Sequence, residues 1–196
     1  MRALRVRNGI FGLLIVEAVV FGLATAAFIL SLFVAYTRLI YIESSETLNQ
    51  FTIGFDTRLA TIEAQSFEIL SNKDVQANMT AYLADPASLA AYTAANDLYT
   101  QLFTRWAIQK DFVAMTFVFN TGRRVTVGDP RIPVPDQAIL SAIVSKAYED
   151  NGAVAWTTGA VGENTVTLYR LIRDISGSGF KPLGVLLIHC PADYLL

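Results

Sequence analysis

One apolar stretch constrains this chain more than any other feature of its sequence. From Gly9 to Ala35 the residues are almost all apolar, and the run contains a single charge, Glu17. At about 1.5 Å of rise per residue, a helix of this length exceeds the roughly 30 Å hydrocarbon core of a membrane. The run therefore predicts a transmembrane helix over residues 9–36, long enough to span the bilayer with some tilt.

The charges beside the run predict its orientation. Arg2, Arg5 and Arg7 precede it within a few residues, whereas only Arg38 follows it closely. Cytoplasmic flanks of membrane helices carry the excess of basic residues. We therefore expect residues 1–8 in the cytoplasm and a single N-terminal span of the cell membrane, with the rest of the chain extracytoplasmic.

A cleaved signal peptide is the competing interpretation of the same stretch. Ala24-Thr25-Ala26 imitates a small-x-small cleavage site after a basic start and an apolar region. Apolar residues continue past that site to Val34, which suits an uncleaved anchor better. Glu17 is left with two roles, an intramembrane functional acid or a carboxylate that reaches toward the headgroups; its place in the cytoplasmic third favours the second.

The helical pattern continues after the membrane segment, over residues 37–71. Apolar residues recur there at steps of three and four, which predicts one long stalk helix with an apolar stripe: Leu48, Phe51, Phe55, Leu59, Ile62 and Ile69, with Ser66 among them. The stripe must be covered by the following domain, by a second copy of the chain, or by both. Ala18, Gly22 and Ala26 add a small-residue face in the membrane helix, so we expect a homodimer.

Residues 72–192 change from helical to strand periodicity near Asp111. Two helices are expected first, over 75–83, where Asn72 belongs to the capping segment, and from Asp85-Pro86 onward. A hairpin over 112–119 and 123–127 follows, then a helix capped by Asp136, then strands over 154–158, 165–172 and 183–190. The predicted fold class is α+β, with strands whose short glycine-bearing connections favour antiparallel neighbours. Residues 193–196 read as the start of a further helix in a longer, truncated chain.

Charge and residue counts exclude several classes of function. The net charge is −2 and no basic cluster follows the membrane segment, so we expect no nucleic acid partner. One cysteine excludes an internal disulfide framework, and one histidine with one cysteine excludes a His/Cys metal cluster. His189 and Cys190 are adjacent on a predicted strand and face opposite sides, so they form no catalytic dyad. We expect no enzyme in this chain, no metal and no cofactor.

Several short motifs in the second half carry a family resemblance. They are Asn151-Gly152, then Trp156, then Tyr169-Arg170-Leu171-Ile172-Arg173-Asp174, then Pro182-Leu183-Gly184-Val185-Leu186-Leu187-Ile188. Together they resemble the distal half of the extracytoplasmic Cache (PAS-like) sensor region in YesM-type bacterial sensor histidine kinases. The resemblance implies an antiparallel sheet of about five strands packed on the stalk helix. The same resemblance implies a ligand pocket on the other sheet face, beneath the smaller helices and loops. It also implies downstream parts: a membrane-proximal subdomain, a second membrane helix, a HAMP linker and a kinase domain.

The chain departs from one subtype of that family. Amino-acid-binding double Cache domains carry an Arg-x-Trp-Tyr element at the end of the helix before the sheet. Here Arg105 and Trp106 are adjacent, and Ala107 follows them. This departure argues against amino acids as the ligand.

Five residues are the candidate ligand-binding residues: Arg170, Trp156, Tyr169, Trp106 and Arg105. Arg170 lies on a predicted strand face with apolar neighbours, and a buried unpaired charge is costly. Its partner is therefore a ligand carboxylate, a structural acid such as Asp174, or solvent. The three aromatic residues form either an aromatic wall for a ligand or part of the core.

Two classes of function remain. The first is a sensory input module of a membrane-bound receptor, in which a small extracellular ligand, for example an anionic one, shifts the stalk helix. A two-component sensor histidine kinase is the favoured output, with a chemoreceptor, a cyclase and a transcription regulator left open. The second class is a membrane-anchored domain for cell-envelope interactions or structure, with no small-molecule ligand.

Overall fold

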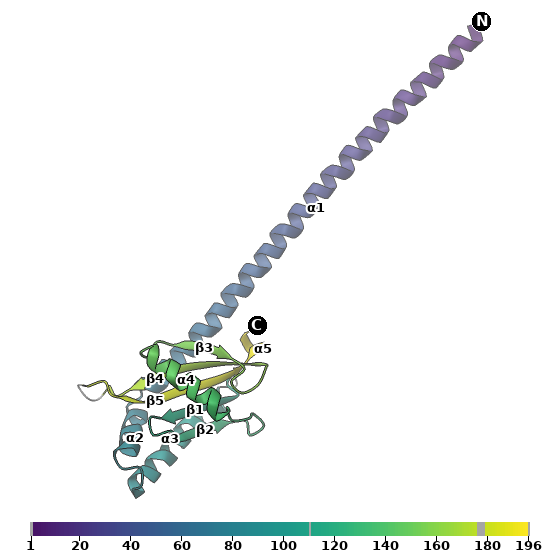
Figure 1. The fold of residues 1–196 in the computed structure, drawn as a ribbon. Helices are drawn as coiled ribbons and strands as arrows, with labels where there is room; N and C mark the ends of the chain where they lie inside the picture. Colours follow the sequence, from purple (N-terminus) through teal and green to yellow (C-terminus); the bar gives the residue numbers. More distant parts are fainter. Residues whose placement is uncertain (1, 110, 176–178, 196) are drawn as a thin grey trace. The chain divides into compact units, whose positions relative to one another are not determined.

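The computed structural model describes residues 2–109, 111–175 and 179–195, with side chains from residue 12 onward. Met1 of the predicted segment 1–8 and Leu196 of the predicted segment 193–196 lie outside the described residues. The chain divides into two compact units, Met1–Ile53 and Gly54–Leu196, and each is described by itself. Figure 1 shows the order of the elements along the chain.

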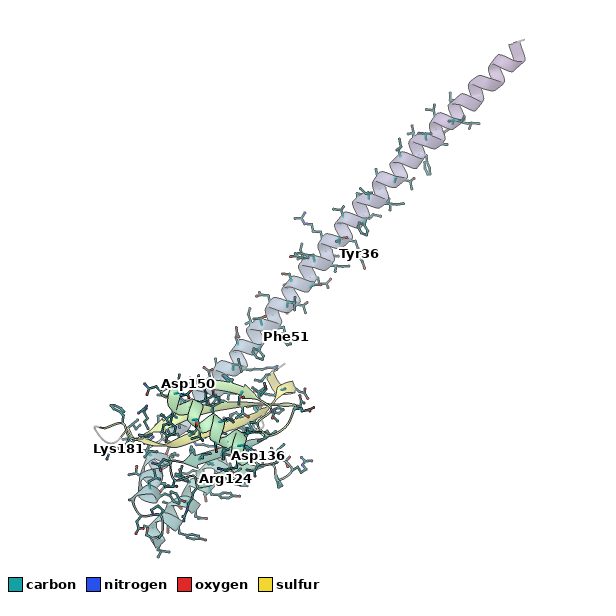
Figure 2. The ribbon with its side chains drawn as sticks, viewed as in Figure 1. Tyr36, Phe51, Arg124, Asp136, Asp150 and Lys181 are labelled. Carbon is teal, nitrogen blue, oxygen red and sulfur yellow. The ribbon has the colours of Figure 1, made fainter. Side chains whose placement is uncertain are left out.

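The first unit consists of helix α1 (Arg2–Ser71) up to Ile53. All side chains described in this part of α1 are exposed, and Figure 2 shows two of them, Tyr36 and Phe51. Among the described helices, α1 is the one that is long and apolar enough to cross a membrane. The long apolar N-terminal helix predicted from the sequence is confirmed, and the membrane itself stays a prediction.

The second unit contains a sheet of five strands in the order β2-β1-β5-β4-β3. Every neighbouring pair is antiparallel, which confirms the predicted sheet. The strands are β1 (Ala114–Phe119), β2 (Arg124–Gly128), β3 (Ala155–Thr158), β4 (Thr165–Arg173) and β5 (Pro182–Pro191). The helices of this unit besides the end of α1 are α2 (Lys73–Ala84), α3 (Leu89–Ile108), α4 (Gln137–Glu149) and α5 (Ala192–Leu195).

Strand β5 is central because both of its faces are buried. Its alternation sends Leu186, Ile188 and Cys190 into a core shared with α2, α3 and the end of α1. Val185 and Leu187 pack on the opposite face against α4. We name these the α1 face and the α4 face of the sheet. Full burial of each large apolar side chain contributes about 1.5–3 kcal/mol, so this two-sided burial holds the layers together.

The stalk stripe is covered only along its second half. In the Gly54–Leu196 unit, Ile62 and Ile69 are buried in the α1-face core, and Phe55 and Leu59 pack partly buried against it. Leu48, which belongs to the first unit, is 67% exposed. The domain alone therefore covers the stripe from Phe55 onward.

The start of α2 agrees with the sequence. Asn72 is its N-cap, and the Asn72 Oδ1 atom accepts hydrogen bonds from the backbone N–H groups of Asp74 and Val75 at 3.0 and 3.1 Å. Such a cap satisfies N–H groups that have no partner within the helix. The last predicted helix is also present, as the short α5.

The start of α3 corrects the sequence prediction. We expected the helix to begin at Asp85-Pro86, but it begins at Leu89 with Ser88 as its N-cap. The Ser88 Oγ atom accepts from the Ala91 N–H at 3.1 Å, while the Ser88 N–H donates to Asp85 O in a turn. A serine two residues after the proline offered the better cap, so the proline lies in the turn instead of the first helical position.

Helix α4 agrees with the prediction in position but not in the role of its cap residue. Asp136 occupies the N-cap position, yet its side chain makes no capping hydrogen bond. The predicted cap by Asp136 is therefore wrong as a side-chain interaction. The helix still forms because Leu140, Ile143 and Ala147 bury one apolar stripe on the sheet.

Candidate ligand-binding site

Two of the five predicted site residues tie the end of α1 to neighbouring elements. The Trp156 indole Nε1–H of β3 donates to Glu63 Oε1 at 3.0 Å. The guanidinium of Arg105 on α3 forms an ion pair with Glu68, with 3.1 Å between Nη1 and Oε1. Both contacts hold α1 through its own acidic residues, so they brace the helix against the sheet and α3.

Trp106 and Tyr169 lie on opposite faces of the sheet. The Trp106 indole Nε1–H donates to Phe112 O at 2.9 Å, and the ring packs partly buried on the α1-face core. Tyr169 is buried in the cluster under α4, and burial raises the pKa of its phenol. These two aromatic side chains therefore cannot form one wall of a single cavity.

Arg170 lies on the α1 face near the end of the stalk. Its Nε–H donates to Gly152 O at 3.3 Å, and its guanidinium carbon lies 5.5 Å from the centre of the Phe67 ring. The side chain lines a cavity of about 210 Å³ together with Phe67, Gly152 and Arg173. None of the predicted aromatic residues lines this cavity.

The structure therefore does not bring Arg170 together with any of the three aromatic residues around one cavity. The register of β4 turns Arg170 toward the α1 face and Tyr169 toward α4. Whether any of the five contacts a ligand stays a prediction.

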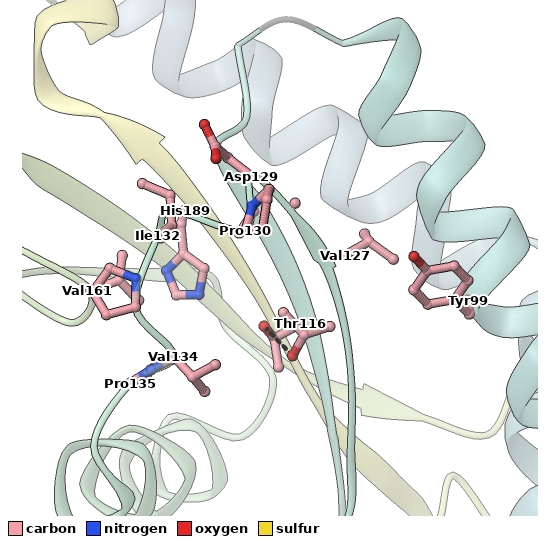
Figure 3. Close-up of a pocket in the computed structure, with 14 residues that line it drawn as sticks. Tyr99, Thr116, Val127, Asp129, Pro130, Ile132, Val134, Pro135, Val161 and His189 are labelled. Carbon is pink, nitrogen blue, oxygen red and sulfur yellow. Dashed lines mark hydrogen bonds between the residues drawn. The ribbon is translucent and has the colours of Figure 1, made fainter.

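A different cavity lies mainly on the α4 face, at the end of the sheet where β1, β2 and β5 meet. Its volume is about 270 Å³. Its lining comes from α3, three strands and two loops: Tyr99, Ala114, Thr116, Thr126, Val127, Gly128, Asp129, Pro130, Ile132, Pro133, Val134, Pro135, Val161 and His189. We call it the His189 cavity. Figure 3 shows the His189 ring among Val161, Val134 and Thr116.

Gly128 shapes the rim of the His189 cavity. With φ of 153°, a Cβ atom placed there would lie 2.5 Å from the Cβ of Ala114, closer than real Cβ contacts. Glycine thus lets the end of β2 approach β1 closely before the chain turns. The Ile132 N–H then closes a turn to Asp129 O at 3.0 Å, and three prolines stiffen the loop that crosses the cavity.

Hydrogen-bonding groups lie at the floor of the His189 cavity, and Thr167 lies behind the His189 ring outside the lining. The hydroxyl oxygens of Thr116 and Thr126 lie 3.1 Å apart, and the Thr167 hydroxyl lies 2.8 Å from His189 Nδ1. Thr116, Thr167 and His189 are each at most 1% exposed. His189 Nε2 has no hydrogen-bond partner among the described residues. Burial of such an atom is costly, which marks this floor as more than a packing surface.

Charge in the cavity is limited to its rim. The Asp129 carboxylate accepts from Arg131 at 2.6 Å from Nη2 and at 2.9 Å from the backbone N–H. The side-chain hydrogen bond from Arg131 is the main cause that lowers the pKa of Asp129 to about 2. Burial lowers the pKa of His189 to about 4, so its imidazole is neutral at pH 7.

Cys190 takes no part in this site. It is fully buried in the α1-face core, while its neighbour His189 faces the cavity on the other side. Burial, with a smaller contribution from Asp111, raises the pKa of the thiol to about 12. The predicted opposite orientation of the two residues is confirmed. A buried thiol with a raised pKa has little of the thiolate that makes cysteine reactive.

Sequence reasoning missed the floor of the cavity. A usable signal was present: Thr116 and His189 interrupt two strands that are otherwise mostly buried and apolar, and Thr167 is a buried polar residue of β4. Each occupies the alternate position that points to the same face of the sheet. Polar residues at matching positions of neighbouring buried strands indicate a shared site.

Matches to known proteins were found among solved structures only. No protein-family model matches the sequence. A search of curated proteins also found no match.

The solved structures that are similar to this chain include ligand-binding domains of chemoreceptors. One is the domain of the amino acid chemoreceptor PctC of Pseudomonas aeruginosa PAO1 with GABA, at 11% identity over 74% of this chain and 59% of that chain, with a TM-score of 0.46. Another is the domain of CtaA of Pseudomonas fluorescens with L-serine, at 14% identity, 76% and 60% coverage and a TM-score of 0.45. A third is the domain of Tlp3 of Campylobacter jejuni with L-norvaline, at 16% identity, 77% and 61% coverage and a TM-score of 0.44. This chain spans about three fifths of the length of each of these domains.

Proposed function

We propose that this chain is the extracytoplasmic ligand-sensing input module of a membrane-bound signalling receptor, and that the His189 cavity holds its small ligand. The observation that carries the proposal is His189, whose side chain lines the cavity and whose buried Nε2 atom is unpartnered among the described residues. A sheet built for structure alone pairs its buried polar atoms or replaces them with apolar ones. A concave site with a few convergent polar groups is typical of ligand binding.

The apolar half of α1 supports the membrane anchor in this proposal. The segment is long enough to span a bilayer, and the arginines before it support a cytoplasmic N-terminus. The domains of the protein are then a cytoplasmic start over 1–8, a membrane helix over 9–36, a stalk over 37–71, the sensor over 72–192 and a continuation from 193.

The sheet offers a route from the cavity to the stalk. His189 of β5 lines the cavity. Two residues earlier on the same strand, Leu187 packs on the α4 face, and Ile188 between them packs on the α1 face. Ile188 belongs to the same buried cluster as Ile62 of α1. A ligand that displaces β5 therefore acts on the packing of the stalk helix, and a small shift of that helix is the signal we propose.

Dimerisation and the output belong to the proposal as well. Leu48 and Phe51 are 67% and 47% exposed on the stalk, and a second copy of the chain would cover them. The family resemblance of the strand motifs supports a two-component histidine kinase as the output. A reading frame that continues past Leu196 into a second membrane helix and a kinase domain would support this output.

The test is a ligand screen with a variant that fills the cavity. Val134 lines the cavity and is 47% exposed, so Val134→Trp adds bulk there while the buried core stays intact. The control is Ile139→Trp on α4, which is 40% exposed and outside the cavity lining. The full chain in lipid nanodiscs is screened by thermal shift against small metabolites.

We expect compounds that raise the melting temperature of the wild type and of Ile139→Trp but have little effect on Val134→Trp. Ligand binding to the folded state alone stabilises it by mass action, by about 2.7 kcal/mol at one hundred times Kd. A compound with an undiminished shift in Val134→Trp would place the ligand outside this cavity. A screen with no positive compound would favour the structural interaction domain instead.

A further inference from the structure

We propose that the His189 cavity takes a small uncharged molecule that offers an acceptor oxygen to the Nε2–H group of His189. This inference rests on the proposed function and names the class of ligand. It follows from which atoms in the cavity carry protons, from the charges that line it and from its size.

The partner of His189 Nδ1 decides which ring nitrogen carries the proton. Thr167 is fully buried, and its hydroxyl lies 2.8 Å from Nδ1, its one hydrogen-bond partner among the described residues. A hydroxyl that accepted from Nδ1–H would leave its own O–H proton buried without an acceptor. The O–H group therefore donates to Nδ1, which leaves the proton of the neutral ring on Nε2. The ring that lines the cavity thus carries an N–H donor without a partner among the described residues.

The threonine pair adds a second donor. The hydroxyls of Thr116 and Thr126 bond to each other at 3.1 Å, and one proton serves that bond. The proton of the other hydroxyl is left for a further acceptor. Two donors close together favour a ligand with an oxygen acceptor, such as an amide carbonyl or an alcohol.

The charges around the cavity argue against an ionic ligand. Among the described residues, no Lys or Arg side chain lines the cavity, so a carboxylate would lose its hydration without a cation from them to replace it. Asp129, the charged group of that described lining, would repel an anion. Arg131 already binds Asp129 through Nε, Nη2 and the backbone N–H, so a cationic ligand would have to displace that arginine.

The rest of the lining is apolar and the space is small. Ile132, Val134 and Val161 face a volume of about 270 Å³, close to the lower limit of typical ligand sites. A short branched or linear carbon skeleton fits these walls. The ligand is therefore small, mostly apolar and uncharged, with one acceptor end.

The experiment uses the single histidine of the chain. The full chain, purified without a histidine tag, is labelled with ¹⁵N-histidine in nanodiscs, so that the one imidazole signal reports His189. At pH 7 we expect the neutral ring with the proton on Nε2. In Thr167→Val this preference should weaken, whereas Thr165→Val on the same face of β4 should keep it, since Thr165 donates to Gly162 O. A ring protonated on Nδ1 in the wild type would overturn the inference.

Three probes with one carbon skeleton test the charge: isovaleramide, isovalerate and isoamylamine. We expect isovaleramide to shift the His189 signal at least tenfold more effectively, by midpoint concentration, than either ion. An equal or better response to isovalerate or isoamylamine overturns the ligand class and leaves the sensing function intact. A silent imidazole with all three probes also overturns the ligand class. The metabolite screen with Val134→Trp decides the sensing function separately.

Discussion

Gly184→Ala should lower the free energy of unfolding more than any other glycine-to-alanine substitution in the sheet. A Cβ atom at this position would lie 2.3 Å from Val118 O and 3.0 Å from Phe119 Cα. Gly184 sits in the central strand and pairs with Phe119 on β1 and Ile172 on β4, so neither neighbour can move aside alone. We expect the free energy of unfolding to fall by about 3 kcal/mol or more.

Urea denaturation of the full chain in nanodiscs measures this loss. Tryptophan fluorescence is a clean probe because both tryptophans, Trp106 and Trp156, belong to the Gly54–Leu196 unit. Gly179→Ala is the matched control, since its nearest atom beyond the neighbouring residues is 3.7 Å away, and we expect a change below about 0.5 kcal/mol. Equal midpoints for the two variants would show that β1 and β5 are not packed as described.

Acid should weaken the domain through His189. Burial holds the pKa of the folded-state imidazole near 4, against 6.5 in the unfolded chain. Between these values the unfolded chain binds a proton that the folded chain does not, so stability falls as the pH drops from about 6.5 to about 4. The full loss is about 3 kcal/mol.

The variant His189→Gln isolates this effect because it cannot take up the proton. Denaturation curves of both proteins at several pH values between 4 and 7 give the comparison. The stability difference between wild type and variant should change by most of the 3 kcal/mol across that range. Asp129 does not interfere with this measurement, because its pKa is about 2 in the folded chain. The stability that its ionised carboxylate contributes is therefore lost only below about pH 4. Parallel pH curves would contradict a buried neutral imidazole.

The sequence was sufficient to predict the elements of the fold. Periods of three to four residues and of two residues predicted all the major helices and all five strands, because each element buries one face or both. The start of α3 was missed because two competing start signals, Pro86 and Ser88, lie only two residues apart. Only the tertiary turn at Asp85 selects between them.

The site was not predictable in the same way. Alternation along β4 separates Tyr169 from Arg170, but it does not say which of the two faces the stalk. That choice depends on the packing of Ile62 and Ile69, about one hundred residues earlier in the chain. The His189 cavity likewise depends on three strands and a proline loop that meet only in the folded domain. Its polar floor was visible in the sequence as isolated residues and not as a group.

The most direct test of the sensing account is disulfide cross-linking of the stalk with and without ligand. Leu48→Cys and Phe51→Cys place thiols on the exposed stripe, and Glu46→Cys places one on the opposite side of the helix. Cys190 can stay, because it is fully buried. The ligand is a compound that stabilises the wild type but not Val134→Trp.

In nanodiscs that hold the full chain, Leu48→Cys and Phe51→Cys should cross-link between copies, and Glu46→Cys should do so much more slowly. Ligand should change the rate at the stripe positions, and Val134→Trp should abolish that change. Cross-linking that is absent at all three positions, or that the ligand leaves unaltered, would contradict a sensor that signals through its stalk.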